Sequence, residues 1–201
     1  MDVNYELLIN NLLDLSHVAF LHGGVLGNDS TVSARLSVEQ DDDDSVSITR
    51  WMPHVKPPGL FDMLYRRDGA LVDHWATMRW IAPSCLVNDA GVTALGAPRS
   101  EGTGIYGLHL LTPVNERKSR YHFAAVRQNP VAFPEHMRVE IMDKLRDLRR
   151  LAFTTQDAPM IEAQQRVIDR TPSNVRPVLL ETDAGIARVH RVLDRLRKVA
   201  H

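Results

Sequence analysis

The sequence has too little cysteine, too little net charge and too few apolar runs for several classes of protein. Cys85 is the one cysteine among 201 residues, so no disulfide framework can form. No apolar run approaches the ~20 residues that a membrane-spanning helix needs, and the N-terminus lacks the basic and hydrophobic order of a signal peptide. The 24 Lys and Arg residues are balanced by 25 Asp and Glu residues, which argues against a nucleic-acid footprint. We therefore expect a cytoplasmic protein without a nucleic-acid or membrane partner.

The hydrophobic periodicity indicates one α+β domain with strands between helices. The length suits one domain, and a hydrophobic content of 44% supports a core. Helical spacing predicts an N-terminal helix over 3–22, an amphipathic helix over 135–153 that a break at 154–159 interrupts, and a last helix near 184–199. Alternation predicts about six antiparallel strands, within 31–39, 45–51, 70–80, 84–95, 105–112 and 119–126. Trp51, Trp75 and Trp80 are expected in the core.

One stretch near the N-terminus combines an acid and two imidazoles in an otherwise apolar run. It reads Asn11-Leu-Leu-Asp14-Leu-Ser-His17-Val-Ala-Phe-Leu-His22-Gly-Gly. Two His and one carboxylate bind Fe(II) and leave coordination positions open. His17 and His22 are five apart, about 140° round a regular helix, so a shared metal requires a distorted helix end, which the two glycines permit. The spacing alone fits two helical histidines without a metal equally well.

Read as D-x2-H-x4-H, this stretch resembles the mononuclear-iron motif of Rieske-type non-haem iron oxygenases. The string from Asn4 to His17 is most similar to the vanillate O-demethylase and dicamba monooxygenase branch. The resemblance covers nearly all of the chain and implies a helix-grip (START/Bet v 1-like) fold, a curved antiparallel sheet with a long C-terminal helix. It also implies that residues 1–201 are a single catalytic domain, which uses mononuclear Fe(II) and O2 to demethylate or hydroxylate a vanillate-like aromatic acid.

A third metal ligand is expected on the late helix that crosses the sheet. The carboxylates available there are Asp143, Asp147, Asp157 and Glu162. The segment that begins Asp157-Ala-Pro-Met resembles the family segment in which an aspartate opens the helix and binds the iron. The resemblance therefore implies His17, His22 and Asp157 as the metal ligands. Asp157 would also suit an ordinary helix N-cap.

The resemblance also assigns roles to Asp14 and Asn11. In the family, the aspartate that matches Asp14 bridges the iron site to a Rieske ligand histidine of a neighbouring subunit. Asp14 lies one helical turn before His17, so its carboxylate could also orient that imidazole. The alternative is an exposed acid on the first helix. Asn11 matches a family position close to the metal.

Two further positions match the dicamba monooxygenase pattern for substrate binding. They are Asn88, at the end of Trp80-Ile-Ala-Pro-Ser-Cys-Leu-Val-Asn88, and His109, at the start of His109-Leu-Leu-Thr-Pro113. In that enzyme the corresponding Asn and His hold the substrate carboxylate, and Leu148 replaces an aromatic wall. Both side chains could instead satisfy backbone groups inside the fold.

A single cysteine cannot hold a Rieske cluster, which needs two Cys and two His ligands. The resemblance therefore implies a [2Fe–2S] cluster in a full-length protein or a partner, electrons from NAD(P)H through a separate reductase, and a homotrimer. Demethylation, monohydroxylation and ring dihydroxylation all stay open. The other function that the sequence allows is a non-catalytic helix-grip module that binds a small hydrophobic ligand.

Overall fold

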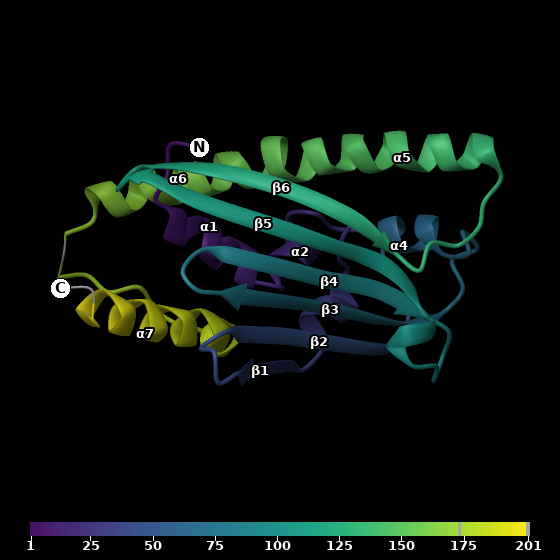
Figure 1. The fold of residues 1–201 in the computed structure, drawn as a ribbon, viewed down its shortest axis with the longest axis horizontal. Coiled ribbons are helices and arrows are strands. Elements are labelled where there is room, and N and C mark those ends of the chain that lie inside the picture. The colour runs from purple at the N-terminus through teal and green to yellow at the C-terminus, as the bar shows by residue number, and fades with distance from the viewer. Residues whose placement is uncertain (173, 200–201) are drawn as a thin grey trace.

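The computed structural model describes residues 1–172 and 174–199, and one antiparallel sheet forms its centre (Figure 1). The six strands pair in sequence order, from β1 to β6. Their bounds are β1 Leu36–Gln40, β2 Val46–Val55, β3 Val72–Ile81, β4 Cys85–Thr93, β5 Thr103–Asn115 and β6 Lys118–Gln128. The predicted α+β class and the predicted antiparallel strands are confirmed.

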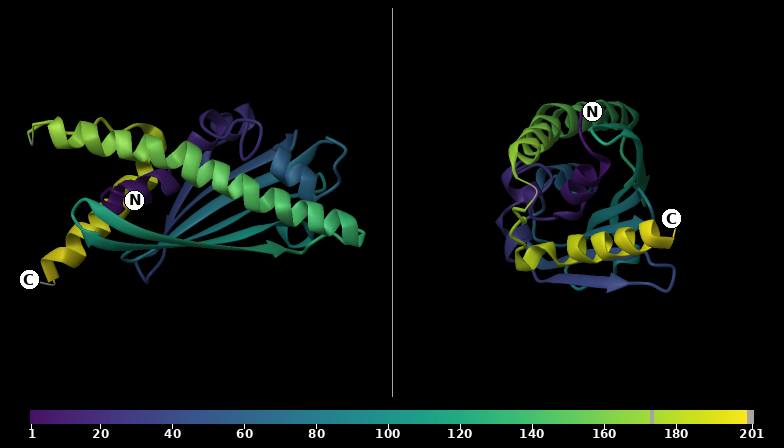
Figure 2. Two further views of the ribbon diagram at one scale, coloured as in Figure 1. Left: turned by 90° about the horizontal axis from the view of Figure 1, so that it is seen from above. Right: turned by 90° about the vertical axis from the view of Figure 1, so that its left-hand side faces the viewer.

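Helices cover one face of this sheet. They are α1 Tyr5–Leu13, α2 His17–Phe20, α3 Asp29–Ser33, α4 Gly59–Leu64, α5 Glu135–Arg150, α6 Ala158–Arg170 and α7 Ala184–Val199. Seen from above, α5 and α6 form one long rod that runs obliquely over the strands (Figure 2). Within the described residues, none of the helices has the length and apolar content needed to cross a membrane.

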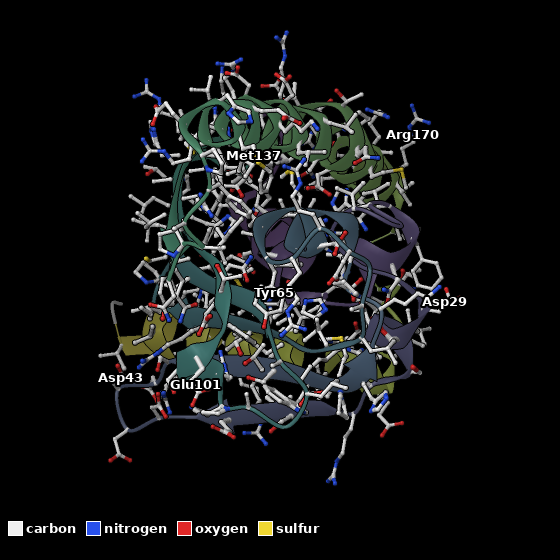
Figure 3. The ribbon with its side chains drawn as sticks, turned by 90° about the vertical axis from the view of Figure 1, so that its right-hand side faces the viewer. Asp29, Asp43, Tyr65, Glu101, Met137 and Arg170 are labelled. Carbon is white, nitrogen blue, oxygen red and sulfur yellow. The ribbon has the colours of Figure 1, made fainter. Side chains whose placement is uncertain are left out.

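Two apolar clusters fill the space between the helices and the sheet. One joins α1, α7 and the strands around Leu8, Ile48 and Val189. The other joins α4, α5 and the sheet around Phe61 and Ile141. Figure 3 looks at the end of the molecule where Tyr65, just after α4, lies below the start of α5 at Met137. The space between the two clusters holds the cavity described below.

The predicted helix over 3–22 is wrong, because the chain breaks at Asp14. Helix α1 ends at Leu13, and Asp14 has φ −81° and ψ 86°, outside the helical region. Its carboxylate Oδ1 accepts a hydrogen bond from the Ser16 N–H at 2.9 Å. Aspartate side chains compete in this way with helical hydrogen bonds. A separate short helix, α2, then carries His17.

The predicted strand over 31–39 begins late, because Asn28 starts a helix. The Asn28 side chain accepts from the Ser30 N–H at 3.1 Å, and Thr31 Oγ1 accepts from the Asn28 N–H at 3.2 Å. This reciprocal arrangement is a capping box, which stabilises the first turn of α3. Local capping therefore outweighs the alternation at Thr31 and Val32, and the strand starts only at Leu36.

The predicted break at 154–159 is also wrong, because the helix widens there instead of ending. Residues Leu151–Asp157 form a π-helical segment, η2, that joins α5 directly to α6. Pro159 lacks an N–H and would clash with the preceding turn of a regular helix. A wider turn accommodates such a residue without ending the helix. One continuous rod from Glu135 to Arg170 results.

The core prediction holds for two of the three tryptophans. Trp75 and Trp80 are fully buried, but Trp51 is 37% exposed. Trp51 pairs with Trp75 across β2 and β3, so the two lie on the same face of the sheet. Arg99 covers the Trp75 ring at 5.1 Å and donates to Asp89 at 2.6 Å. This loop cover is what buries Trp75 on the outer face.

A buried arginine on β2 ties the segment around His17 to the sheet. Arg50 is 2% exposed, and its Nη1 donates to the carbonyl oxygens of Thr31, Val32 and Ala34. Its Nη2 donates to Ser16 Oγ at 2.8 Å. Ser16 precedes His17, so this guanidinium fixes both ends of the connection between α1 and β1.

We expect Arg50→Met to lower the free energy of unfolding by about 3 kcal/mol, because it leaves buried carbonyl oxygens without a donor. Urea unfolding measures this change. Arg35→Met is the matched control, since Arg35 is exposed, and it should change stability by less than about 0.5 kcal/mol. Equal effects of the two substitutions would contradict the role given to Arg50.

Candidate metal centre

A cavity of about 710 Å³ lies between the inner face of the sheet and the helices. Its walls are mostly apolar, as is usual for small-molecule sites. Six of the residues proposed from the sequence line it, namely Asn11, His17, His22, Asn88, His109 and Asp157. Asp14 is not among the lining residues and lies at the C-cap of α1.

The side chains of His17, His22 and Asp157 converge at one point of this cavity. Their ligand atoms all lie within 4.8 Å of one another. Asp157 Oδ1 is 3.1 Å from His22 Nε2 and 3.7 Å from His17 Nε2. The chain therefore brings a carboxylate from the long rod to two imidazoles that precede the sheet.

The backbone after α2 allows the two histidines to meet despite their five-residue spacing. Helix α2 ends at Phe20, and His22 lies in the turn that follows. A Cβ on Gly23 would lie 2.8 Å from the Ala19 carbonyl oxygen, too close for any other residue. A distorted helix end, as the sequence suggested, is thus present at these residues.

Both imidazoles are held in the same tautomer by their second nitrogen. His17 Nδ1 bonds the carbonyl oxygen of Asp14, and His22 Nδ1 bonds Gln156 Oε1 at 2.7 Å. Both partners are acceptors, so each Nδ1 carries the proton and each Nε2 keeps its lone pair. Hydrogen bonds of this kind orient metal-binding histidines. Gln156 was not expected from the sequence, and only its position next to Asp157 hinted at it.

The carboxylate is buried in a way that suits a cation. Asp157 is 3% exposed, and its Oδ1 has no hydrogen-bond donor among the described residues. The Nε2 of His22 lies near it but presents a lone pair in this tautomer. Two nitrogen lone pairs and an unsatisfied carboxylate oxygen facing one point fit a divalent metal, which would satisfy all three.

The structure does not support the alternative roles considered for the acidic residues of the long rod. Asp157 occupies the N-cap position of α6, but its side chain makes no capping hydrogen bond. Asp143 and Asp147 are exposed on α5, on the side where Arg146 lies. Glu162 does not join the histidines, since only Asp157 does so among the described residues.

Protons would compete with a metal at His22. Burial lowers the pKa of His22, but the Asp157 carboxylate and the Gln156 side chain more than offset this effect, so the pKa is raised. Metal binding requires the neutral imidazole, so acid should weaken it.

The structure changes the expected role of the Asp14 side chain. The main-chain carbonyl of Asp14 orients His17, whereas its carboxylate accepts from the Ser16 N–H. The carboxylate is therefore not the group that positions the imidazole. Asn11, near the end of α1, lines the same cavity as the two histidines.

Asn88 and His109 share the inner face of the sheet. Asn88 pairs with Gly107, and His109 pairs with Leu86, so the two side chains are diagonal neighbours that point the same way. His109 Nδ1 lies 2.6 Å from the Tyr121 hydroxyl, and its buried Nε2 has no hydrogen-bond partner in the described part of the chain. Burial lowers the pKa of His109 to about 4, so its ring is neutral near pH 7.

His74 is a cavity residue that the sequence analysis did not select. It lies on β3, is 1% exposed and packs against the Phe61 ring at 4.9 Å. Neither ring nitrogen has a hydrogen-bond partner among the described residues, and burial lowers its pKa to about 3. The alternation over 70–80 places His74 on the same face as Met78 and Trp80. This pattern could have identified it from the sequence as a residue of the inner face.

Comparison with known proteins relates nearly the whole chain to one family. Residues 1–199 match the model described as the vanillate O-demethylase oxygenase C-terminal domain. The chain is 33% identical over 195 residues to the oxygenase component of chloroacetanilide N-alkylformylase from Rhizorhabdus wittichii, covering 96% of this chain and 54% of that protein. It is 28% identical over 200 residues to the oxygenase component of dicamba O-demethylase from Stenotrophomonas maltophilia, covering 99% and 57%. The chain thus spans about half the length of the curated relatives it matches.

A solved structure extends the likeness to the fold. The crystal structure of dicamba monooxygenase bound to 3,6-dichlorosalicylic acid matches with a TM-score of 0.88 and 26% identity, covering 100% of this chain and 57% of that chain. The helix-grip-like arrangement of sheet and long helices is thereby confirmed.

We expect His74 to make the protein sensitive to acid. The unfolded chain binds a proton at His74 near pH 6.5, and the folded chain only near pH 3. Stability is therefore lost as the pH falls through this window, at up to about 1.4 kcal/mol per pH unit. Between about pH 7 and about pH 5, urea unfolding should show a loss about 2 kcal/mol smaller in His74→Leu than in the unmodified chain.

The control for this measurement is His122→Leu, because His122 is exposed on β6. Its pH dependence should equal that of the unmodified chain. A His74→Leu variant with an unchanged slope would mean that His74 titrates alike in both states.

Proposed function

Because the chain belongs to the family of vanillate O-demethylase oxygenase C-terminal domains, we propose that it is the catalytic domain of a Rieske-type non-haem iron oxygenase. It binds one mononuclear Fe(II) through His17, His22 and Asp157 and acts on an aromatic acid by demethylation or hydroxylation. The observation that carries this proposal is the convergence of two imidazole Nε2 atoms and an unsatisfied buried carboxylate on one point.

The protein's own part in the reaction is to hold the iron, to orient its histidine ligands and to keep water out of the cavity. When bound, the iron supplies the activation of O2 that demethylation or hydroxylation of an unactivated carbon requires. Two imidazoles and one carboxylate leave coordination positions open for O2. The Asp14 carbonyl and Gln156 keep Nε2 of each histidine deprotonated. The apolar lining keeps bulk water from the reacting carbon.

The proposed substrate is an aromatic acid. A solved relative, dicamba monooxygenase, holds 3,6-dichlorosalicylic acid. In this chain, Asn88 and His109 offer side-chain groups for hydrogen bonds on one face of the sheet. A buried carboxylate needs such donors, because its desolvation without them is costly.

The electrons for turnover have to come from outside these residues, because one cysteine cannot build a Rieske cluster. We assign them to a [2Fe–2S] domain fed by a reductase that uses NAD(P)H, in a cytoplasmic homotrimer. Asp14 is the proposed link from a neighbouring subunit's cluster to His17, and Asn11 lies on the same helix end.

Anaerobic titration with Fe(II) should show one ion bound per chain. His17→Ala, His22→Ala and Asp157→Asn should each abolish tight binding, because each removes a ligand. Gln156→Leu should weaken it by about 10–100-fold, because His22 loses the acceptor that orients it. Iron analysis after gel filtration measures both effects.

His122→Ala is the control for this titration, since it removes an exposed histidine far from the centre in sequence. It should bind iron normally. If the chain bound aromatic acids but no iron, the oxygenase proposal would be wrong and the chain would be a ligand-binding module.

In the complete oxygenase, Asp14→Asn should keep iron content and strongly reduce turnover. The substitution retains both the main-chain carbonyl that holds His17 and the side-chain oxygen that accepts from Ser16, so only the charge is lost. Iron content and the rate of electron transfer from the reduced cluster are measured together. An unchanged transfer rate would remove Asp14 from the electron path.

A further inference from the structure

The strand register arranges the cavity floor in rows that run across the sheet. One row contains Trp80, Leu86, His109 and Phe123; the next contains Met78, Asn88, Gly107 and Ala125; a third contains Arg50, Ala76, Ala90, Ile105 and Arg127. The second and third rows contain one glycine and three alanines, so the floor is open at those positions. Each polar side chain on the floor therefore has mainly apolar or small neighbours in its row.

Arg127 is a cation in the cavity wall for which the described residues supply no ion-pair partner. It lies near the end of β6, opposite Ile105, on the inner face of the sheet. Its Nε and Nη2 are buried and have no hydrogen-bond partner among the described residues. Burial lowers the pKa of Arg127, although a guanidinium remains protonated in proteins. A charge placed in this way requires an anion or a polar acceptor.

Arg50, at the other end of the same row, shows what a structural arginine looks like in this sheet. Both of its terminal nitrogens donate to the protein, to three carbonyl oxygens and a hydroxyl, and of its nitrogens only the buried Nε lacks a partner among the described residues. Within residues 1–172 and 174–199, Arg127 has no comparable set of acceptors. Arg50 therefore stabilises the fold, whereas the acceptor for Arg127 has to come from a ligand.

The balance of charge around the cavity also favours an anion. The lining contains three arginines, Arg127, Arg146 and Arg149, and one acid, Asp157. Asp157 belongs to the proposed metal centre. Arg146 already pairs with Asp143 on the exposed side of α5. Arg127 is thus the cation of the sheet floor that remains for a ligand.

We propose that Arg127, together with Asn88 in the adjacent row, binds the anionic group of the substrate. This inference rests on the proposed function and names the residue that selects for an acid. The guanidinium fork can hold a carboxylate through two parallel hydrogen bonds. His109 lies in the row of Phe123 and its ring is neutral, so it contributes no charge to this site.

The position of Arg127 also sets the direction of the substrate. Arg127 is four residues along β6 from Phe123, a separation of about 13 Å at the rise of a strand. Phe123 packs against Phe153 on the rod that carries Asp157. The acid group is therefore held toward one end of the cavity, and the carbon to be oxidised faces the histidines at the other.

The test is equilibrium binding of 3-methoxybenzoate and of its neutral amide, 3-methoxybenzamide, to the 201-residue chain by calorimetry. Arg127→Gln should weaken benzoate binding by about tenfold or more, because a hydrogen bond to a charged group is lost. Binding of the amide should change less than about twofold. Arg127→Lys, which keeps the charge without the fork, should lose less benzoate affinity than Arg127→Gln.

Arg120→Gln is the matched control, because Arg120 is an exposed cation on the same strand and the opposite face. It should bind both probes normally. Equal losses for both probes in Arg127→Gln would overturn the proposal, since Arg127 would then only shape the cavity. An unchanged benzoate affinity would overturn it as well, and so would an unmodified chain that does not prefer the benzoate.

Iron titration separates this inference from the proposed function. Arg127→Gln should bind Fe(II) as the unmodified chain does, and its thermal unfolding midpoint should not fall, because no hydrogen bond of the folded protein is removed. A chain that binds iron without preferring the benzoate would refute the role of Arg127 alone. A chain that prefers the benzoate but binds no iron would refute the oxygenase assignment and leave the anion site standing.

Discussion

A buried guanidinium holds the segment that carries both histidines against the sheet. Between Asp14 and Leu36 the chain has only two short helices, α2 and α3, whose own hydrogen bonds cannot fix their position. Arg50 binds carbonyl oxygens within α3 and directly after it, and the hydroxyl of Ser16, at the same time. A charged donor among buried carbonyls is costly to disturb, so the location of His17 depends on this one side chain.

The second requirement of the centre is a carboxylate from the rod that follows the sheet in sequence. The rod of α5, η2 and α6 crosses the strands and places Gln156 and Asp157 beside the histidines. Its π-helical turn accommodates Pro159 and lets two consecutive residues serve the same site, one by orienting an imidazole and one by facing the metal position. Such widened turns are frequent at functional sites.

The cavity divides its polar groups between two tasks. At one end, the histidines and Asp157 supply neutral nitrogens and one carboxylate, a donor set for a cation. Along the floor, Asn88 and Arg127 supply donors for an anion, and small residues leave room between them. Most of the remaining wall is apolar, so a ligand with one acidic end and one apolar end has a defined orientation.

The sequence by itself determined the elements whose signals are local. Alternation predicted the strands of the meander, and helical spacing predicted α5 and α7. Likeness to a family indicated the two histidines from the N-terminal string, and Asp157 from the segment that begins Asp157-Ala-Pro-Met. The predictions from periodicity alone were wrong at Asp14, Asn28 and Pro159. At Asp14 and Asn28 a side-chain hydrogen bond sets the backbone conformation, and at Pro159 the missing N–H does so. Only the tertiary structure distinguished Arg50 from Arg127 and revealed Gln156 and His74, because the partners and burial of a long polar side chain are set by segments distant in sequence.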